Sequence, residues 1–173
     1  MKVLLIALGA LLAATPTHPA LDDPTIVAIF DAANSYDIET SQLALKQSHA
    51  KAVRDLAQQF MHDHGAVQQQ GRDLAKRLGV TPTPPKENPL APAHEQALKA
   101  LRGKSGAEFD QAYAAEEVRF HQAVLDAVST TLLPAIQNAE LKAFVEKVGP
   151  AFQGHLEAAK QLQKQLAPAA AGK

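Results

Sequence analysis

Residues 53–78 read VRDLAQQFMHDHGAVQQQGRDLAKRL and contain the pattern on which the predicted fold rests. At alternating steps of four and three residues, small or apolar side chains recur through the segment and are interrupted once, by His64. The positions in this series are Val53, Ala57, Phe60, His64, Val67, Gly71, Leu74 and Leu78. This spacing puts the side chains on one face of an α-helix that packs against a partner helix. The segment therefore predicts a long helix whose buried face carries a histidine.

The same spacing recurs in two later segments, and each of them is again interrupted by a single histidine. The first series is Ala114, Val118, His121, Leu125, Val128 and Leu132. The second is Leu141, Val145, Val148, Phe152, His155, Ala159, Leu162 and Leu166. Three such apolar series, which we call seams, each with one histidine, indicate a polar site in the interior of a helical protein.

Signals for helix ends divide the chain into four long helices. The predicted starts are Asp23-Pro24, with Asp as N-cap and Pro in the first turn, Ser48, the capping box Ser105/Glu108, and Asn138. The predicted ends are Gly79 for the second helix, the residue before Pro134 for the third, and about Leu166 for the fourth. Pro150 should kink the fourth helix.

A proline-rich segment separates the second helix from the third. Residues 81–92 contain five prolines, at positions 82, 84, 85, 89 and 92, and predict an extended chain that rises about 3.1 Å per residue. Followed by a short helix at residues 93–102, this linker can return along a helix of about 45 Å. The sequence therefore predicts an all-α protein, a four-helix bundle with the ferritin-like topology and a long Pro-rich crossover between helices 2 and 3.

The N-terminus has the features of an export signal. Lys2 precedes a 12-residue apolar run, and residues 15–20 are small or proline-rich. A run of that length is too short to cross a bilayer, and no later segment has the length to do so. We expect residues 1–20 to be a cleaved signal peptide, residues 21–166 the helical domain and residues 167–173 a flexible tail, in a protein that is periplasmic or secreted.

Composition excludes several classes of function. The net charge is −1 with both signs interspersed, and there is no basic stripe with interleaved aromatic residues, which argues against nucleic acid as a partner. The chain has no cysteine, so disulfides, thiolate metal sites and a cysteine nucleophile are excluded. No Glu-x-x-His pair, phosphate-binding loop or nucleophile elbow is present, and we assign no catalytic residue.

The polar residues of the seams are candidate ligands for a metal. In the predicted topology, His64 and His121 lie at one height, and Glu39 and His155 about 9 Å below them, with Glu117 between the two layers. Imidazole and carboxylate suit Zn, Cu, Fe or Mn in a site without thiols. The alternative interpretation is that each histidine is a neutral core residue, hydrogen-bonded to a neighbour because buried polar groups need partners.

A set of spaced residues carries a resemblance to a known family. The set comprises Glu39 with Leu43-Ala44, Val53 and Phe60 before Asp63-His64, Leu78-Gly79, Phe109-Asp110-x-x-Tyr113 before His121, Phe144, and Pro150 before His155-Leu156. Across residues 23–166 the chain resembles the exported bacterial family known as domain of unknown function 4142, which is classed with ferritin-like folds. The resemblance implies a helical bundle in the periplasm or cell envelope and no established reaction. Its polar signature falls here on Glu39, His64, Asp110, Tyr113, His121 and His155.

Three functions are consistent with these observations. The first is a periplasmic metal-binding protein in which Glu39, His64, His121 and His155 are ligands or bond to ligands, Glu117 is a further candidate, and Asp110 and Tyr113 give polar support. The second is a non-enzymatic envelope or stress-related protein that binds a protein partner, or a second copy of itself, and whose seam histidines are structural. The third is a small-ligand pocket between the helices, which a thermal-shift screen could expose. Loss of metal from histidine variants would discriminate between the first two.

Overall fold

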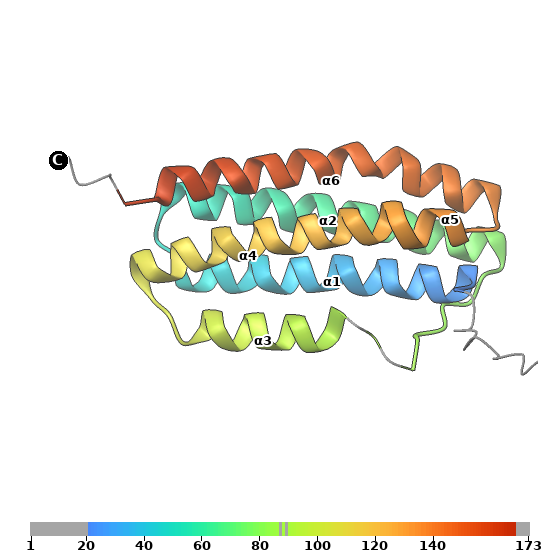
Figure 1. Ribbon diagram of the computed structural model, residues 1–173, viewed down its shortest axis with the longest axis horizontal. Helices are drawn as coiled ribbons and strands as arrows, with labels where there is room; N and C mark the ends of the chain where they lie inside the picture. The colour runs from blue at the N-terminus through green and yellow to red at the C-terminus, as the bar shows by residue number, and fades with distance from the viewer. Residues whose placement is uncertain (1–20, 87, 89, 169–173) are drawn as a thin grey trace, which may run out of the picture.

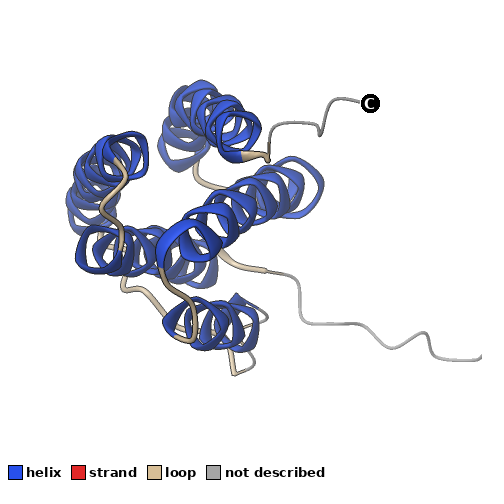
Figure 2. Ribbon diagram, turned by 90° about the vertical axis from the view of Figure 1, so that its left-hand side faces the viewer, coloured by secondary structure: helices blue, strands red, loops and turns tan. Residues whose placement is uncertain are grey.

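A computed structural model describes residues 21–86, 88 and 90–168 (Figure 1). All secondary structure in this part of the chain is helical, which confirms the predicted all-α class (Figure 2). The elements are α1 (Asp23–Gln47), α2 (Lys51–Leu78), α3 (Leu90–Arg102), α4 (Gly106–Ala127), the π-helical turn η1 (Val128–Leu132), α5 (Leu133–Ala135) and α6 (Ala139–Leu166). The predicted signal peptide and residues 169–173 of the predicted tail lie outside the described residues.

The four long helices α1, α2, α4 and α6 lie side by side (Figure 1). The colour gradient shows that α1 and α2 run in opposite directions, as do α4 and α6, whereas α2 and α4 run in the same direction. The most extensive packing is within the pairs α1–α2 and α4–α6. The short helix α3 lies along α1, and the connection that contains it returns the chain to the end at which α2 begins.

Side chains and glycine define the helix ends close to the predicted positions. The cap of α1 is Asp22, one residue before the predicted Asp23, and its carboxylate accepts the N–H of Thr25 at 2.9 Å. Asn138 caps α6 as predicted, since its side chain accepts two backbone N–H groups of the first turn. Gly79 ends α2 with φ of +68°, a left-handed conformation that side chains with a Cβ rarely adopt.

Four predicted helix signals differ from the structure. Ser48 does not cap α2, which begins at Lys51 after Ala50; the Ser48 hydroxyl donates to Asp110 and accepts the N–H of Ala50. The capping box at residue 105 does not form, because the side chain of Ser105 makes no capping hydrogen bond and Glu108 pairs with Lys104 instead. The third long helix does not end before Pro134; it continues through η1 into α5. Pro134 is tolerated because it lies in the first turn of α5, where a backbone N–H needs no partner in the helix. Pro92 likewise lies in the first turn of α3, which begins at Leu90 rather than at residue 93. α6 remains helical through Pro150.

The interior consists of two apolar cores separated by a polar layer. One core surrounds the turn between α1 and α2 and includes Phe60, Phe109 and Tyr113. The other lies toward α5 and includes Ile26 and Leu132. Between them are buried polar side chains: Asn34, Asp37, His64, Glu117, His121 and His155. No helix among the described residues is long and apolar enough to cross a membrane.

Candidate metal centre

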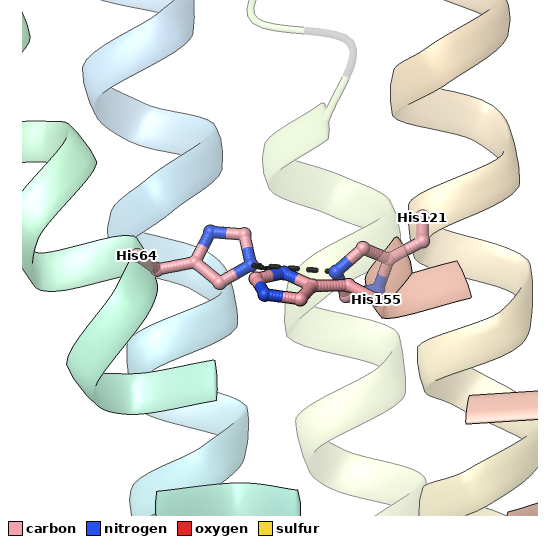
Figure 3. Close-up of side chains that lie close together, drawn as sticks. All are labelled: His64, His121 and His155. Carbon is pink, nitrogen blue, oxygen red and sulfur yellow. Dashed lines mark hydrogen bonds between the residues drawn. The ribbon is translucent and has the colours of Figure 1, made fainter. Parts of the chain in front are cut away.

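The three seam histidines meet at one point in the polar layer (Figure 3). His64 comes from α2, His121 from α4 and His155 from α6, and all three are buried. His64 Nε2 lies 3.3 Å from His121 Nε2 and 3.2 Å from His155 Nδ1. We call these residues the histidine cluster. Three ring nitrogens from three helices therefore face one another.

In each ring, the nitrogen that points away from the cluster faces a hydrogen-bond acceptor. His64 Nδ1 lies 3.0 Å from Asn34 Oδ1, and the amide orientation of Asn34 is fixed because its Nδ2 donates to the carbonyl of Phe30 at 2.8 Å. His121 Nδ1 lies 3.0 Å from the carbonyl oxygen of Glu117.

In the third ring, His155 Nε2 lies 3.0 Å from Asp63 Oδ2. These acceptors place one N–H on the outer nitrogen of every ring. The three inner nitrogens consequently present lone pairs to one another.

A fourth donor atom comes from α1. Asp37 Oδ2 lies 3.5 Å from His64 Nε2 and 3.6 Å from His121 Nε2. Asp37 is 1% exposed, and among the described residues its Oδ2 has no hydrogen-bond partner. Its other oxygen accepts a long hydrogen bond, 3.5 Å, from Ser41 Oγ. Each of the four long helices thus contributes one donor atom to the same point.

Four of the six separations among these donor atoms are close to those around a tetrahedral metal ion, and the three histidine nitrogens all lie within 4.8 Å of one another. With metal–ligand bonds of about 2.0–2.1 Å, the ligand atoms of a tetrahedral zinc site lie about 3.3–3.4 Å apart. The four separations described above range from 3.2 to 3.6 Å. The outward N–H groups have the hydrogen-bonded arrangement that orients metal-binding histidines in proteins. The set is chemically suited to a divalent transition metal.

A second buried carboxyl group adjoins the cluster. Glu117 Oε2 lies 3.5 Å from His121 Nδ1, and neither oxygen of Glu117 has a hydrogen-bond partner in the described part of the chain. Burial raises the pKa of Asp37 to about 7. Burial, and then the charge of Asp37, raise the pKa of Glu117 well above its ordinary value. Without a nearby cation, these two carboxyl groups therefore retain protons toward neutral pH.

The imidazoles of the cluster are held in their neutral form. Burial lowers the pKa of His64 well below its ordinary value, and repulsion from the other two rings lowers it further. Burial also lowers the pKa of His121 to about 4 and lowers that of His155. Neutral imidazole is the form that binds metals.

The structure places Glu39 outside the cluster. Its side chain is 54% exposed and its carboxylate lies 2.9 Å from Nε2 of His94 on α3, whose ring stacks on Tyr36. The expectation of two layers, with Glu39 beside His155, is therefore wrong. Side chains lean toward the N-terminus of their own helix, so His155 on α6 leans toward His64 and His121, which lean the opposite way from α2 and α4.

The other predicted polar residues have separate roles. Asp110 is buried near the turn between α1 and α2, where its carboxylate accepts a 2.5 Å hydrogen bond from Ser48 Oγ. Tyr113 is fully buried, and its hydroxyl lies 3.5 Å from Ser41 Oγ, on the side of Asp37 and Glu117 that is nearer the α1–α2 turn. Burial and then the charge of Glu117 raise the pKa of Tyr113 well above its ordinary value.

The sequence analysis did not identify Asp37, the carboxylate that faces the histidine cluster, or Asn34, the hydrogen-bond partner of His64. A signal for both was present. The alternating step that reveals the other seams also runs through Val27, Phe30, Asn34, Asp37, Ser41, Ala44 and Ser48. A neighbouring face of this helix, with Ile26, Ile29, Ala33, Tyr36, Thr40 and Leu43, is more apolar. Apolar periodicity therefore favours that face as the inward one, which puts Glu39 near the interior.

Comparison with known proteins shows the family of this chain. A family model described as a domain of unknown function (DUF4142) matches residues 9–162, most of the chain. The chain belongs to the DUF4142 family. No curated protein and no solved structure matches it. The description of DUF4142 gives no function, so a function for this member has to be argued from its buried site.

Proposed function

We propose that this DUF4142 protein binds one divalent first-row transition metal ion in the centre of a ferritin-like four-helix bundle. The proposed ligands are His64 Nε2, His121 Nε2, His155 Nδ1 and Asp37 Oδ2. The observation that carries the proposal is that three imidazole nitrogens converge within 4.8 Å of one another, and that Asp37 Oδ2, which has no hydrogen-bond partner among the described residues, lies 3.5 and 3.6 Å from two of them. Zn, Fe, Cu and Mn all accept this combination of nitrogen and oxygen donors.

The energetics favour a cation at this point. Facing lone pairs repel one another, and a buried carboxylate without a partner costs several kcal/mol. A divalent cation replaces both penalties with attraction and permits Asp37 to ionise. Asn34, Asp63 and the carbonyl of Glu117 then hold the rings in the orientation that the metal requires.

The proposed class and location have separate support. A long connection between parallel second and third long helices is the topology of ferritin-like folds, and α2 and α4 are related in this way (Figure 1). Carboxylates and histidines that project inward from facing helices are also typical of metal sites in bundles. The apolar N-terminal segment supports export to the periplasm or beyond.

Elemental analysis of residues 21–173, purified without a His tag and without chelator, tests the proposal. We expect near-stoichiometric metal in the parent and none in a His64→Ala/His121→Ala variant that remains helical by circular dichroism. The matched control is His49→Ala/His62→Ala, which removes two exposed histidines and should retain the metal. Metal retained after loss of His64 and His121 would refute the site. Absence of metal from the parent, even after reconstitution with each ion, would show that the histidines are structural.

A further inference from the structure

We propose that an apolar passage leads from the protein surface to the histidine cluster and delivers a small neutral diatomic molecule, of the class of dioxygen and nitric oxide, to the bound metal. This inference rests on the proposed metal centre. Its evidence is independent of the ligand geometry, because it comes from two adjacent cavities on the side of the cluster that faces α5.

The inner cavity has a volume of about 20 Å³ and touches the cluster directly. His64 and His121 form part of its wall, together with three phenylalanines, Phe30, Phe120 and Phe152. Its one amide, that of Asn34, has its Oδ1 beside His64 Nδ1 and its Nδ2 bonded to the carbonyl of Phe30. The inner cavity therefore offers little to a guest that needs hydrogen bonds.

The outer cavity adjoins the inner one. Its volume is about 30 Å³, and it shares four wall residues with the inner cavity, namely Phe30, Ala33, Val124 and Val128. Its other walls include Ile29, Leu90 and Ala127, which are partly exposed to solvent. Both cavities have partly exposed walls, and together they extend from the region between α1 and the start of α3 to the buried cluster.

The size and lining of the two cavities determine which molecules can enter them. A cavity needs about 10–15 Å³ to hold one water molecule, so each of these two spaces accommodates one very small molecule. The lining is almost entirely aliphatic and aromatic, which gives water few partners and makes entry of an ion costly. A neutral diatomic molecule fits the volume and loses little solvation on entry.

The passage and the carboxyl groups lie on opposite sides of the cluster along the bundle. Asp37 and Glu117 are one turn nearer the α1–α2 turn than Ala33 and His121 on their own helices, whereas Val128 lies toward α5. Val128 opens η1, and π-helical turns often occur at functional sites. A metal held at this point would have the carboxylate of Asp37 on one side, and a neutral molecule that approached from the apolar side would become its fifth ligand.

The test uses Ala33→Leu, which fills the wall shared by both cavities. Its matched control is Ala32→Leu on the adjacent residue of α1, which lines a separate surface groove. Xenon under pressure, located by crystallography in the protein as purified, probes the cavities without relying on a metal. Nitric oxide binding to the iron(II)-loaded protein, followed by stopped-flow absorbance, then probes the route.

We expect xenon in the cavities of the parent and of Ala32→Leu but not of Ala33→Leu. Association of nitric oxide should be at least about tenfold slower in Ala33→Leu, with iron content unchanged. Absence of xenon from the parent would overturn the passage whatever the metal content. An unchanged association rate in Ala33→Leu would overturn it as the route. Xenon binding in a parent that takes up none of Zn, Fe, Cu and Mn on reconstitution would overturn both proposals, and the metal content would show that the metal centre failed first.

Discussion

Replacement of Asp37 by asparagine should stabilise the metal-free protein and destabilise the metal-bound one. Asp37 is fully buried, and its Oδ2 has no hydrogen-bond partner among the described residues. Asparagine has nearly the same shape and carries no charge. Its amide N–H groups can also donate to the lone pairs of His64 and His121, which lie 3.5 and 3.6 Å from the present oxygen.

The magnitude follows from the pKa of Asp37. Its pKa is about 7 in the folded chain against an ordinary value of 3.8, so ionisation of this group favours the unfolded chain. The contribution of the group to stability is complete below pH 3.8 and is lost as pH rises through 7. Above neutral pH, the raised pKa lowers the free energy of unfolding by about 4 kcal/mol, and roughly 2 kcal/mol of this is already lost near pH 5.5.

Urea denaturation followed by circular dichroism measures this effect directly. In chelator, Asp37→Asn should raise the free energy of unfolding by up to about 4 kcal/mol near pH 8, and by roughly half of that near pH 5.5. With saturating zinc the order should reverse, because the variant has lost a ligand. Asp55→Asn, which removes a carboxylate that is 57% exposed, is the control and should change stability by less than about 0.5 kcal/mol. A loss of stability in Asp37→Asn in chelator, or a gain that does not grow with pH, would refute the reasoning.

Three further predictions concern the surroundings of the site. Zinc binding near pH 6 should release about one proton more in the parent than in Asp37→Asn, because the carboxyl group of Asp37 is protonated before the metal binds. Calorimetry in buffers of different ionisation enthalpy measures this release, and equal proton release from the two proteins would contradict the prediction. Asp63→Asn should weaken zinc binding about 10–100-fold by loosening the ring of His155, as measured by competition with a chromophoric chelator. Glu39→Ala should leave metal content unchanged, and metal loss in this variant would restore Glu39 as a ligand.

The sequence was sufficient to place the histidines and insufficient to assemble their surroundings. His64, His121 and His155 each interrupt an apolar seam, and an isolated polar residue in such a seam is readily identified. Asp37 lies in a seam that is itself largely polar, so apolar periodicity did not identify the inward face of α1. The height of His155 also depended on how side chains lean in antiparallel helices, which residue counting ignores.

The helix ends also divide into those that local geometry determines, which the sequence predicts, and those that depend on competing contacts. Asn138 and Gly79 act through local geometry and were predicted correctly. Ser105 depends on a choice between competing partners, since Glu108 pairs with Lys104 rather than closing the capping box. Pro134 depends on where one helical turn ends and another begins, and the π-helical turn η1 before it has no simple sequence signature.

The origin of the four proposed ligands on four different helices has a consequence for how long the folded molecule lasts. Packing is most extensive within the α1–α2 and α4–α6 hairpins. Two ligands come from each hairpin, so the hairpins cannot separate without breaking coordinate bonds. Metal occupancy should therefore act mainly on the unfolding rate, and amide hydrogen exchange across all four helices should slow together while the ends of the chain exchange as before. In the proposed location outside the cytoplasm, supply of the ion would then set how long the folded protein survives proteolysis.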